Sequence, residues 1–397
     1  MWKTHHTYLV LAAALLATMT THAPAQEAEL LAVLRSDATI QEKSAACREL
    51  ARVATQEAVP TLAALLGDEK LSHMARYALE TIPDPAVDAA LRDALGKVQG
   101  RPQLGVIGSL GARRDGQAVP ALAALLTGTD SETVQAAARA LGCIGTPEAA
   151  AALRQVLPGA AGRNQTAICE GLFRCAEALA HAGQAAAAQA IYDDVRAVAD
   201  APAQVRVAAL RGAILARGQD GIPLLVEAIQ GPDYALAAAA VRAAMESPGP
   251  AVTAALLDTL PKAPIERQGL LILALADRGA PQVLPAVLEA AQSSDEQLRV
   301  TALRALKRVG DASCVPALLA AAVEGSAEVA PAALDALESL QDPAVDEQLV
   351  KQLAEAQGKT RTVLIELATR RRTAAAAPAL WQAADDTRME VRAAALA

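Results

Sequence analysis

A repeat of about 31 residues organises this chain more strongly than any other feature of its sequence. Steps of 31 from Leu79 reach an aliphatic residue every time, with one longer interval of 38 residues between Leu172 and Leu210. The aliphatic series comprises Leu79, Leu110, Leu141, Leu172, Leu210, Val241, Ile272, Leu303, Leu334, Ile365 and Leu396. A period of this length is typical of supersecondary units that stack on one another.

A second series marks the start of another helix in six of the repeats. An aliphatic or small residue followed by proline opens each apolar stretch, and the first turn of a helix favours proline because its missing N–H would be unpaired there. These dipeptides are Val59-Pro60, Val119-Pro120, Ile222-Pro223, Leu284-Pro285, Val315-Pro316 and Ala377-Pro378. A polar loop follows, and then a second helix that carries the aliphatic residue of the first series. Gly142 and Gly310 fit left-handed caps at the ends of two second helices.

The 38-residue interval predicts lengthened helices across residues 177–198, and the composition indicates how all these helices pack. Only seven residues are aromatic, two Trp, four Tyr and one Phe, so alanine, leucine and valine must build the core. One helix pair is too small to bury its apolar face alone, so neighbouring pairs must share a continuous core. The sequence therefore predicts an all-α solenoid domain over residues 26–397, with about twelve helix pairs.

Several segments resemble HEAT repeats of the phycobilisome-lyase (PBS-lyase) type. The resemblance rests on Val119-Pro120-Ala121-Leu122 to Asp130 followed by residues 134–142, on Asp295 with residues 298–303, and on Asp386 with residues 391–394. It implies a right-handed superhelix whose second helices line the concave side. It also implies a ladder of hydrogen bonds between neighbouring repeats, made here by Asp200–Arg206, Asp295–Arg299 and Asp386–Arg392. The same repeat occurs in enzymes, adaptors and assembly factors, so it says little about function.

The amino terminus has the pattern of a secretory signal peptide. Lys3 precedes an apolar run over residues 8–16, and Ala23-Pro24-Ala25 forms a small-residue cleavage site. We expect cleavage after Ala25 and a periplasmic or extracellular protein, with no stable membrane span because no apolar stretch approaches 20 residues. Removal of residues 1–25 changes the net charge from −8 to −9, because 35 basic residues then face 44 acidic ones. An acidic surface repels phosphate backbones, which argues against nucleic acid as a partner.

No residue in the sequence points to catalysis, a cofactor or a metal. His73 and His181, the histidines of the mature chain, are isolated, and zinc, Walker, nucleophile-elbow and haem-attachment motifs are absent. We expect the glycine-rich residues 105–111 to serve close helix packing, since they fall on a second helix. The five cysteines are far apart, and Cys169 and Cys175 are too distant along one helix for a disulfide. They are read as small buried apolar residues.

Binding is the better hypothesis, and eight residues are candidates for a groove on the second helices. They are Tyr77, Glu80, Glu170, Phe173, Arg174, Arg211, Arg242 and Arg304. The last three fall one or two repeats apart and could form a positive stripe for an acidic partner. The alternative is a row of solvated arginines that pair with nearby carboxylates. Likewise, Arg76–Glu80 and Glu170–Arg174 have the spacing of local helical salt bridges.

The sequence favours a non-catalytic exported scaffold that binds a protein partner or positions an attached domain. A second hypothesis is the repeat arm of an exported multidomain enzyme, with a sugar-hydrolase-like or cytochrome c domain beyond Ala397. The chain ends on an aliphatic position of the repeat, without a helix cap or a polar terminal repeat, which predicts further sequence there. A third, weaker hypothesis is an enzyme similar to the bilin lyases, whose photosynthetic setting the signal peptide opposes.

Overall fold

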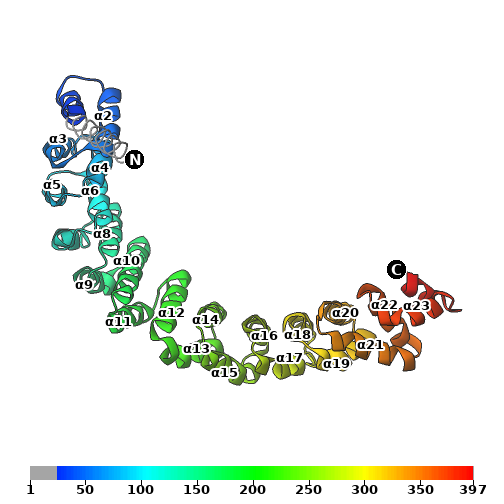
Figure 1. Ribbon diagram of the computed structural model, residues 1–397. Coiled ribbons are helices and arrows are strands. Elements are labelled where there is room, and N and C mark those ends of the chain that lie inside the picture. Colours follow the sequence, from blue (N-terminus) through cyan, green and yellow to red (C-terminus); the bar gives the residue numbers. More distant parts are fainter. Residues whose placement is uncertain (1–24, 397) are drawn as a thin grey trace, which may run out of the picture. The chain divides into compact units, whose positions relative to one another are not determined.

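The computed structural model describes residues 25–396, and within that range it contains helices, turns and loops but no β-strand (Figure 1). Two compact units divide the chain after Ala216. The helices follow one another as twelve pairs, six in each unit, which confirms the predicted number of helix pairs. The all-α, superhelical solenoid class is confirmed as well. Of the predicted signal peptide, residues 1–24 lie outside the described residues.

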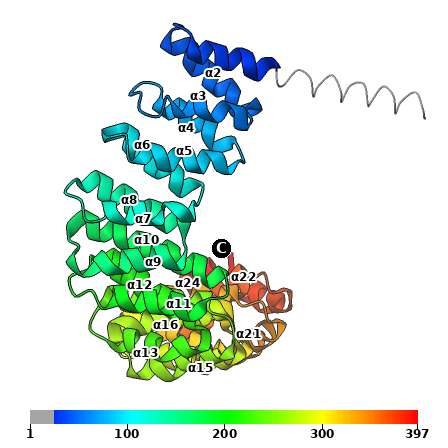
Figure 2. The same ribbon diagram turned by 90° about the vertical axis from the view of Figure 1, so that its left-hand side faces the viewer.

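The helices of the first unit are residues 25–35, α2 (Ile40–Val53), α3 (Val59–Ala63), α4 (Ser72–Thr81), α5 (Pro85–Leu95), α6 (Gly100–Ala112), α7 (Val119–Leu125), α8 (Ser131–Ile144), α9 (Pro147–Val156), α10 (Gly162–His181), α11 (Ala185–Arg196) and α12 (Ala203–Arg217). Even-numbered labels mark the second helix of each pair. Second helices α2, α4, α6, α8 and α10 pack on one another in that order, and first helices such as α3 and α5 form the other layer. Figure 2 shows the pairs α3/α4 to α9/α10 stacked one above another.

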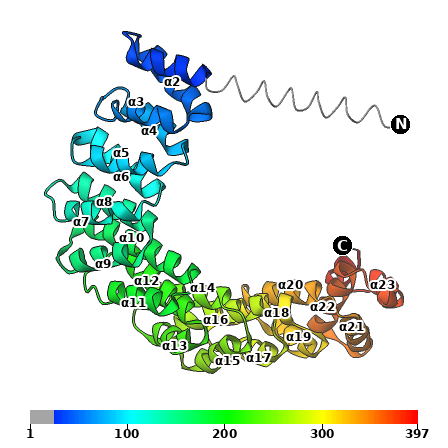
Figure 3. The ribbon, with the colours of Figure 1, turned by 60° about the vertical axis from the view of Figure 1, so that its left-hand side comes forward.

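The helices of the second unit are α13 (Ile222–Gln230), α14 (Tyr234–Glu246), α15 (Pro250–Thr259), α16 (Ile265–Arg278), α17 (Leu284–Ala290), α18 (Glu296–Val309), α19 (Val315–Glu324), α20 (Val329–Ser339), α21 (Pro343–Glu355), α22 (Gly358–Arg370), α23 (Ala377–Ala384) and α24 (Met389–Leu396). Here too the second helices α14 to α24 pack in sequence. Figure 3 shows α14, α16, α18 and α20 in one row and α13, α15, α17 and α19 in another.

Proline opens more of the first helices than the dipeptide series indicated. All six predicted dipeptides lie at the start of a first helix, each directly after a short 3₁₀ turn. Four further first helices also begin with proline, namely Pro85, Pro147, Pro250 and Pro343. The fixed φ of proline suits the first helical turn, so nearly every first helix starts in the same way.

Most of the aliphatic series forms the core, but two members are misplaced by one residue. Leu79, Leu110 and Ile272, for example, are fully buried. Val241 and Leu334 are only half-buried, whereas the preceding alanines, Ala240 and Ala333, are completely buried. These repeats are therefore 30 residues long, followed by one of 32, and a fixed step of 31 misses the inward-facing position by 100° of helix rotation.

The predicted left-handed caps at Gly142 and Gly310 are wrong. Gly142 lies inside α8, and Gly145 is the left-handed residue that ends this helix, with φ of 70°. Gly310 ends α18 in an extended conformation, with φ of −75°. Gly142 is needed for a different reason, because a Cβ there would lie 2.7 Å from the Cα of Gly171 on α10. The residue serves close packing of two helix backbones.

The longer interval in the repeat extends one helix, as predicted. Helix α10 has 20 residues and continues to His181, while α11 follows after a short turn. None of the described helices is both long and apolar enough to cross a membrane.

Candidate functional site

In the first unit, the outer face of the second helices, which is the face turned away from the first helices, carries exposed aromatic, acidic and basic side chains. Helices α4, α6, α8 and α10 pack side by side, and their outward positions carry Tyr77, Glu80, Glu170 and Arg174. Tyr77 is one of the few aromatic residues of the chain, and its side chain is 55% exposed instead of packing in the alanine- and leucine-rich core. The structure therefore places four of the predicted groove residues on one continuous row of helices.

A pocket of about 420 Å³ lies between α6 and α8 on this face. We call it the α6–α8 pocket; its lining residues are Leu104, Gly108, Glu132, Gln135, Ala136, Arg139, Ala140 and Cys143. Gly108 creates much of the space, because no heavy atom lies within 4 Å of the position that its Cβ would occupy. Gly111, three residues later on α6, has the opposite effect. A Cβ at Gly111 would lie 2.7 Å from the Cα of Ala140, so the two helices touch there.

Charged and polar groups surround the small apolar floor of the α6–α8 pocket. Glu132 and Arg139 are exposed on α8, two turns apart, and offer one charge of each sign. Between them, Gln135 Nε2 donates to Ser131 Oγ at 2.8 Å and to Asn164 Oδ1 on α10 at 3.3 Å. Fixed polar groups around an apolar depression can orient a polypeptide segment. Gly-rich residues 105–111 thus serve helix packing, as predicted, and also open this depression.

Arginines bridge the neighbouring helices at both ends of the row. Arg174 Nη1 on α10 donates to Cys143 Sγ on α8 at 3.1 Å. Arg76 Nη1 on α4 donates to the Gly105 carbonyl oxygen on α6 at 3.3 Å. Burial lowers the pKa of Arg76, partly offset by the nearby charge of Glu80. Gly105 leaves the room for this guanidinium, since a Cβ would lie 2.3 Å from its central carbon.

The salt bridges predicted within α4 (Arg76–Glu80) and within α10 (Glu170–Arg174) do not form, because both arginines contact other groups. Arg76 reaches the next helix, and Glu80 accepts a hydrogen bond of 2.5 Å from Ser109 Oγ on α6. Arg174 turns to Cys143 and leaves Glu170 exposed. In both cases the side chains contact the adjacent repeat, because close helix packing brings those partners within reach.

Phe173 has a packing role that its place among the groove candidates did not indicate. Its ring stacks on Tyr192 of α11, with 5.9 Å between ring centroids. Tyr192 is buried, and Gly212 on α12 provides its space, because a Cβ there would lie 2.1 Å from the Tyr192 ring. Burial raises the pKa of Tyr192. Phe173 is half-buried and borders the surface without standing free in it.

The three predicted groove arginines are all exposed on second helices. Arg211 lies on α12 of the first unit, while Arg242 and Arg304 lie on α14 and α18 of the second. Between the latter two, α16 carries Leu273 at the matching position, 46% exposed. Within the second unit, therefore, the predicted positive stripe is interrupted by an apolar residue.

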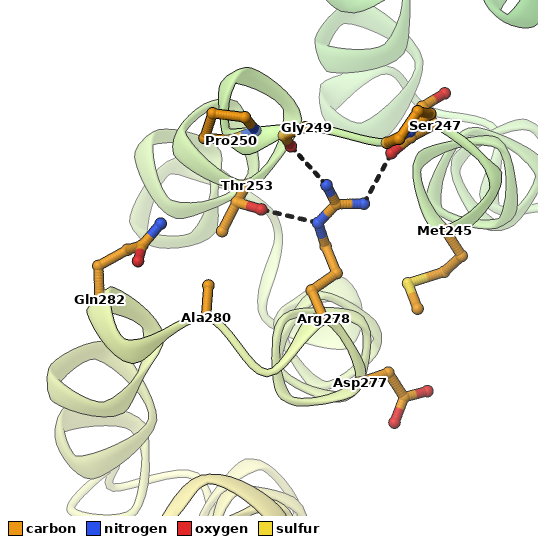
Figure 4. Close-up of a pocket in the computed structure, with 10 residues that line it drawn as sticks. Met245, Ser247, Gly249, Pro250, Thr253, Asp277, Arg278, Ala280 and Gln282 are labelled. Carbon is orange, nitrogen blue, oxygen red and sulfur yellow. Dashed lines mark hydrogen bonds between the residues drawn. The ribbon is translucent and has the colours of Figure 1, made fainter.

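An arginine contact that sequence analysis missed ties successive repeats together. Arg278 at the end of α16 donates through Nε to Thr253 Oγ1 and through its other nitrogens to the carbonyl oxygens of Ala244, Ser247 and Gly249, at 2.7 to 3.0 Å. Figure 4 shows this guanidinium between the Ser247–Pro250 loop and Thr253, in a pocket of about 430 Å³. These bonds satisfy carbonyl groups left free at the end of α14.

Two other arginines make the same contact. Arg113 and Arg371 donate to carbonyl oxygens at the ends of α4 and α20, and to Asp88 and Asp346. In all three cases the side-chain acceptor lies 25 residues before the arginine, a spacing that could have been found in the sequence.

The ladder implied by Asp295–Arg299 and Asp386–Arg392 is wrong. Asp295 caps the start of its own helix, α18, by accepting from the Leu298 backbone N–H. Arg392 donates to the carbonyl oxygens of Asp386 and Thr387 in its own repeat. Short aspartate side chains before a helix are strong N-caps, so they are used locally.

The cysteines are unpaired, and four of the five are buried, as predicted. Burial raises the pKa of Cys47 and Cys169 to about 11 and that of Cys175 to about 12. Cys143, at the edge of the α6–α8 pocket, is the half-exposed one. From residue 25 to residue 396, no group of three or more His, Cys, Asp and Glu side chains is placed to hold a metal ion.

Comparison with known protein families identifies the repeat. The family model described as HEAT repeats matches residues 27–102, 100–172, 265–338 and 284–366, together more than half of the chain. The chain belongs to the HEAT-repeat family. The match is to HEAT repeats in general, and the PBS-lyase type remains a prediction. A comparison with curated proteins gave no match.

Solved structures with the same fold include two large HEAT-repeat-like proteins. Kap95p, solved in a study of its binding to RanGDP, is 13% identical with a TM-score of 0.51, over 93% of this chain and 60% of Kap95p. Kap121p is 10% identical with a TM-score of 0.55, over 93% of this chain and 48% of Kap121p. Kap121p bound to Nup53p is 12% identical with a TM-score of 0.55, over 94% of this chain and 48% of Kap121p. This chain spans about half the length of Kap121p, and the similarity concerns the fold.

Proposed function

We propose that this protein is a non-catalytic scaffold that binds another protein on the second-helix face of its first unit. The observation that carries the proposal is the α6–α8 pocket, where Gly108 opens an apolar depression beside Arg139 and Glu132. The pocket can hold an apolar side chain, while Arg139 and Arg174 favour a carboxylate on the same segment. Kap121p, which has a similar fold, has been solved with Nup53p bound, and this supports protein binding as the use of such a surface.

Export is part of the proposal. The basic start, the apolar run of residues 8–16 and the Ala23-Pro24-Ala25 site are the support for a cleaved leader. Expression in a bacterial host followed by fractionation and intact-mass measurement tests this step. A periplasmic or secreted protein that begins at Gln26 is expected, and a cytoplasmic protein that retains residues 1–25 would refute export.

A quantitative affinity purification tests protein binding. Tagged wild-type protein and a Gly108→Leu variant are recovered from native cells, and the co-purified proteins are compared by mass spectrometry. The leucine fills the α6–α8 pocket, so the specific partner should fall at least tenfold, which corresponds to about 1.4 kcal/mol of binding free energy. Ala124→Leu is the matched control, because Ala124 is exposed on the first helix α7. Equal recovery with both variants would refute this site.

A further inference from the structure

A pocket in the second unit plays no part in the function proposed above. It lies between α18 and α19 and has a volume of about 590 Å³. The buried side chains of Leu303, Leu306 and Leu318 lie beneath it, and its accessible apolar groups are Pro316, Ala317, Ala320 and Ala321 of α19. Helix α17 has only seven residues whereas α19 has ten, so we attribute the pocket to the side of α19 that the shorter helix leaves uncovered. We call it the α18–α19 pocket.

Arg299 lines the α18–α19 pocket without a partner for its charge. Its Nε is buried and has no hydrogen-bond partner among the described residues. Arg267, which lies 32 residues earlier near the start of α16, behaves differently. Its Nη1 donates to the carbonyl oxygen of Ile229 at 2.6 Å and also to that of Gly231. Arg267 lies one residue earlier in its repeat than Arg299, at the position of the buried Leu298, so it contacts a helix end whereas Arg299 faces the pocket.

A buried donor without a partner favours a ligand that supplies an acceptor, and a guanidinium best matches a carboxylate. Arg299 shares the pocket with Ala317 and Ala321 of α19, so the ligand must present a carboxylate next to an apolar group. The last residue of a polypeptide does this when its side chain is aliphatic.

We propose that the α18–α19 pocket binds the free C-terminal carboxylate of a partner polypeptide whose last residue is aliphatic. The carboxylate pairs with the Arg299 guanidinium, and the aliphatic side chain lies against Ala317 and Ala321 of α19. Glu324 is exposed and also lines the pocket, so it can accept a backbone N–H of the bound chain and repel a second acidic group. The inference rests on the proposed function in one respect, namely that the partner is a protein.

Fluorescence anisotropy with a synthetic peptide tests the proposal on the full chain. The probe is a fluorescein-labelled hexapeptide, Gly-Ser-Gly-Ser-Ala-Leu, made with a free C-terminal carboxylate and, separately, with a C-terminal amide. The free acid should bind at least tenfold more tightly than the amide, because only the acid pairs with Arg299. Equal binding of the two peptides, or no binding of the acid at millimolar protein, would overturn the proposal. This comparison needs no variant.

Variants locate the site. Arg299→Gln should weaken binding of the acid peptide at least tenfold, while Arg299→Lys retains part of it. Arg304→Gln is the matched control, because Arg304 is exposed on the same helix and does not line the pocket. Equal losses with Arg299→Gln and Arg304→Gln would overturn the assignment. Helical circular dichroism and the unfolding midpoint of each variant check its folding.

Two further measurements separate this inference from its alternatives. Decanoate, an apolar carboxylate that is not a peptide, should compete weakly; Arg299-dependent binding of decanoate without binding of the acid peptide would overturn a polypeptide ligand. Gly108→Leu should bind the peptide as wild type does, since its substitution lies in the first unit. If the wild-type protein fails to bind the acid peptide but still recovers its partner through the α6–α8 pocket, this inference alone is refuted and the proposed function stands.

Discussion

At the scale of single residues, burial distinguishes the cysteines from one another. The thiolate is the nucleophilic form, and a pKa raised to about 11 or 12 leaves almost none of it at pH 8 for Cys47, Cys169 and Cys175. Burial also raises the pKa of Cys314. Cys143 is half-exposed and contacts Arg174.

We therefore predict that one thiol of the folded protein reacts rapidly at pH 8 and that the other four react only after unfolding. Titration with a chromogenic disulfide reagent, followed by peptide mass mapping, measures this. Cys143→Ser should remove the rapid phase. Rapid reaction of two or more thiols in the folded protein would contradict the burial described here.

Arg371 shows what one side chain contributes to the joint between repeats. Its Nη1 donates to the carbonyl oxygens of Leu337 and Leu340 at 2.6 and 2.8 Å, and its Nε donates to Asp346 at 2.8 Å. This hydrogen bond from Arg371 is the main cause that lowers the pKa of Asp346 below its ordinary value of 3.8. The side chain of Arg371 is only 7% exposed, so its bonds are protected from water.

Arg371→Met should lower the free energy of unfolding by about 2–4 kcal/mol, because buried carbonyls and a carboxylate lose their donor. Arg370→Met is the control and should cost less than about 1 kcal/mol, since its ion pairs are on the surface. Chemical denaturation of both variants gives the comparison. Equal losses of unfolding free energy in the two variants would contradict the role of Arg371 in joining the repeats.

The same contact predicts a direction for acid sensitivity. A depressed carboxyl pKa stabilises the fold at pH values above the ordinary pKa, and this stabilisation is lost as the pH falls through the lower, folded-state value. The wild-type protein should therefore lose stability on acidification below about pH 4 more steeply than Arg371→Met does. Unfolding midpoints between pH 7 and pH 2 measure the difference.

At the scale of helices, glycine sets how closely the second helices approach. A Cβ at Gly142 would lie 2.7 Å from the Gly171 Cα and 2.9 Å from its carbonyl oxygen, and neither backbone atom can move without separating α8 from α10. On the neighbouring second helix α6, a Cβ at Gly108 would meet nothing within 4 Å. Gly142 matches Gly111 in the 31-residue repeat, whereas Gly108 lies three residues earlier and on the open side of its helix.

Gly142→Ala should therefore destabilise the protein by about 1–3 kcal/mol through overpacking. Gly108→Ala should stabilise it by about 0.5–1 kcal/mol, because alanine is the better helix former and has room. Equilibrium denaturation of the two variants in parallel gives both signs. A stabilising Gly142→Ala would show that α8 and α10 are farther apart than described.

Local sequence signals predicted the helices well, because proline, the aliphatic period and the polar loops each act within one repeat. They predicted the inward position less well where the repeat changes length, as at Val241 and Leu334. The joints between repeats were not predicted, since Arg113, Arg278 and Arg371 contact acceptors that lie 25 or more residues away in the chain. The α6–α8 pocket was missed for the same reason: Gly108 is informative only once its neighbours on α8 are known.

At the scale of the whole molecule, the chain is a HEAT-repeat solenoid whose first unit offers a surface with apolar, acidic and basic groups. The larger part of each repeat is committed to packing, as the buried alanines and leucines show. On the outer face of the second helices, the exposed side chains differ in charge and polarity from one repeat to the next. We therefore place the proposed function on that face of the first unit and predict that the face of its first helices takes no part in binding the partner.

Site-specific photo-crosslinking in native cells tests that claim most directly. A benzophenone amino acid is placed at Arg139, beside the α6–α8 pocket, and in a second strain at Ala124, which is exposed on the first helix α7. One discrete crosslinked protein is expected from position 139 and none from position 124, and the product should be lost when Gly108→Leu is added. Crosslinks of equal yield from both positions, or a product at 139 that persists with Gly108→Leu, would contradict the proposed binding face.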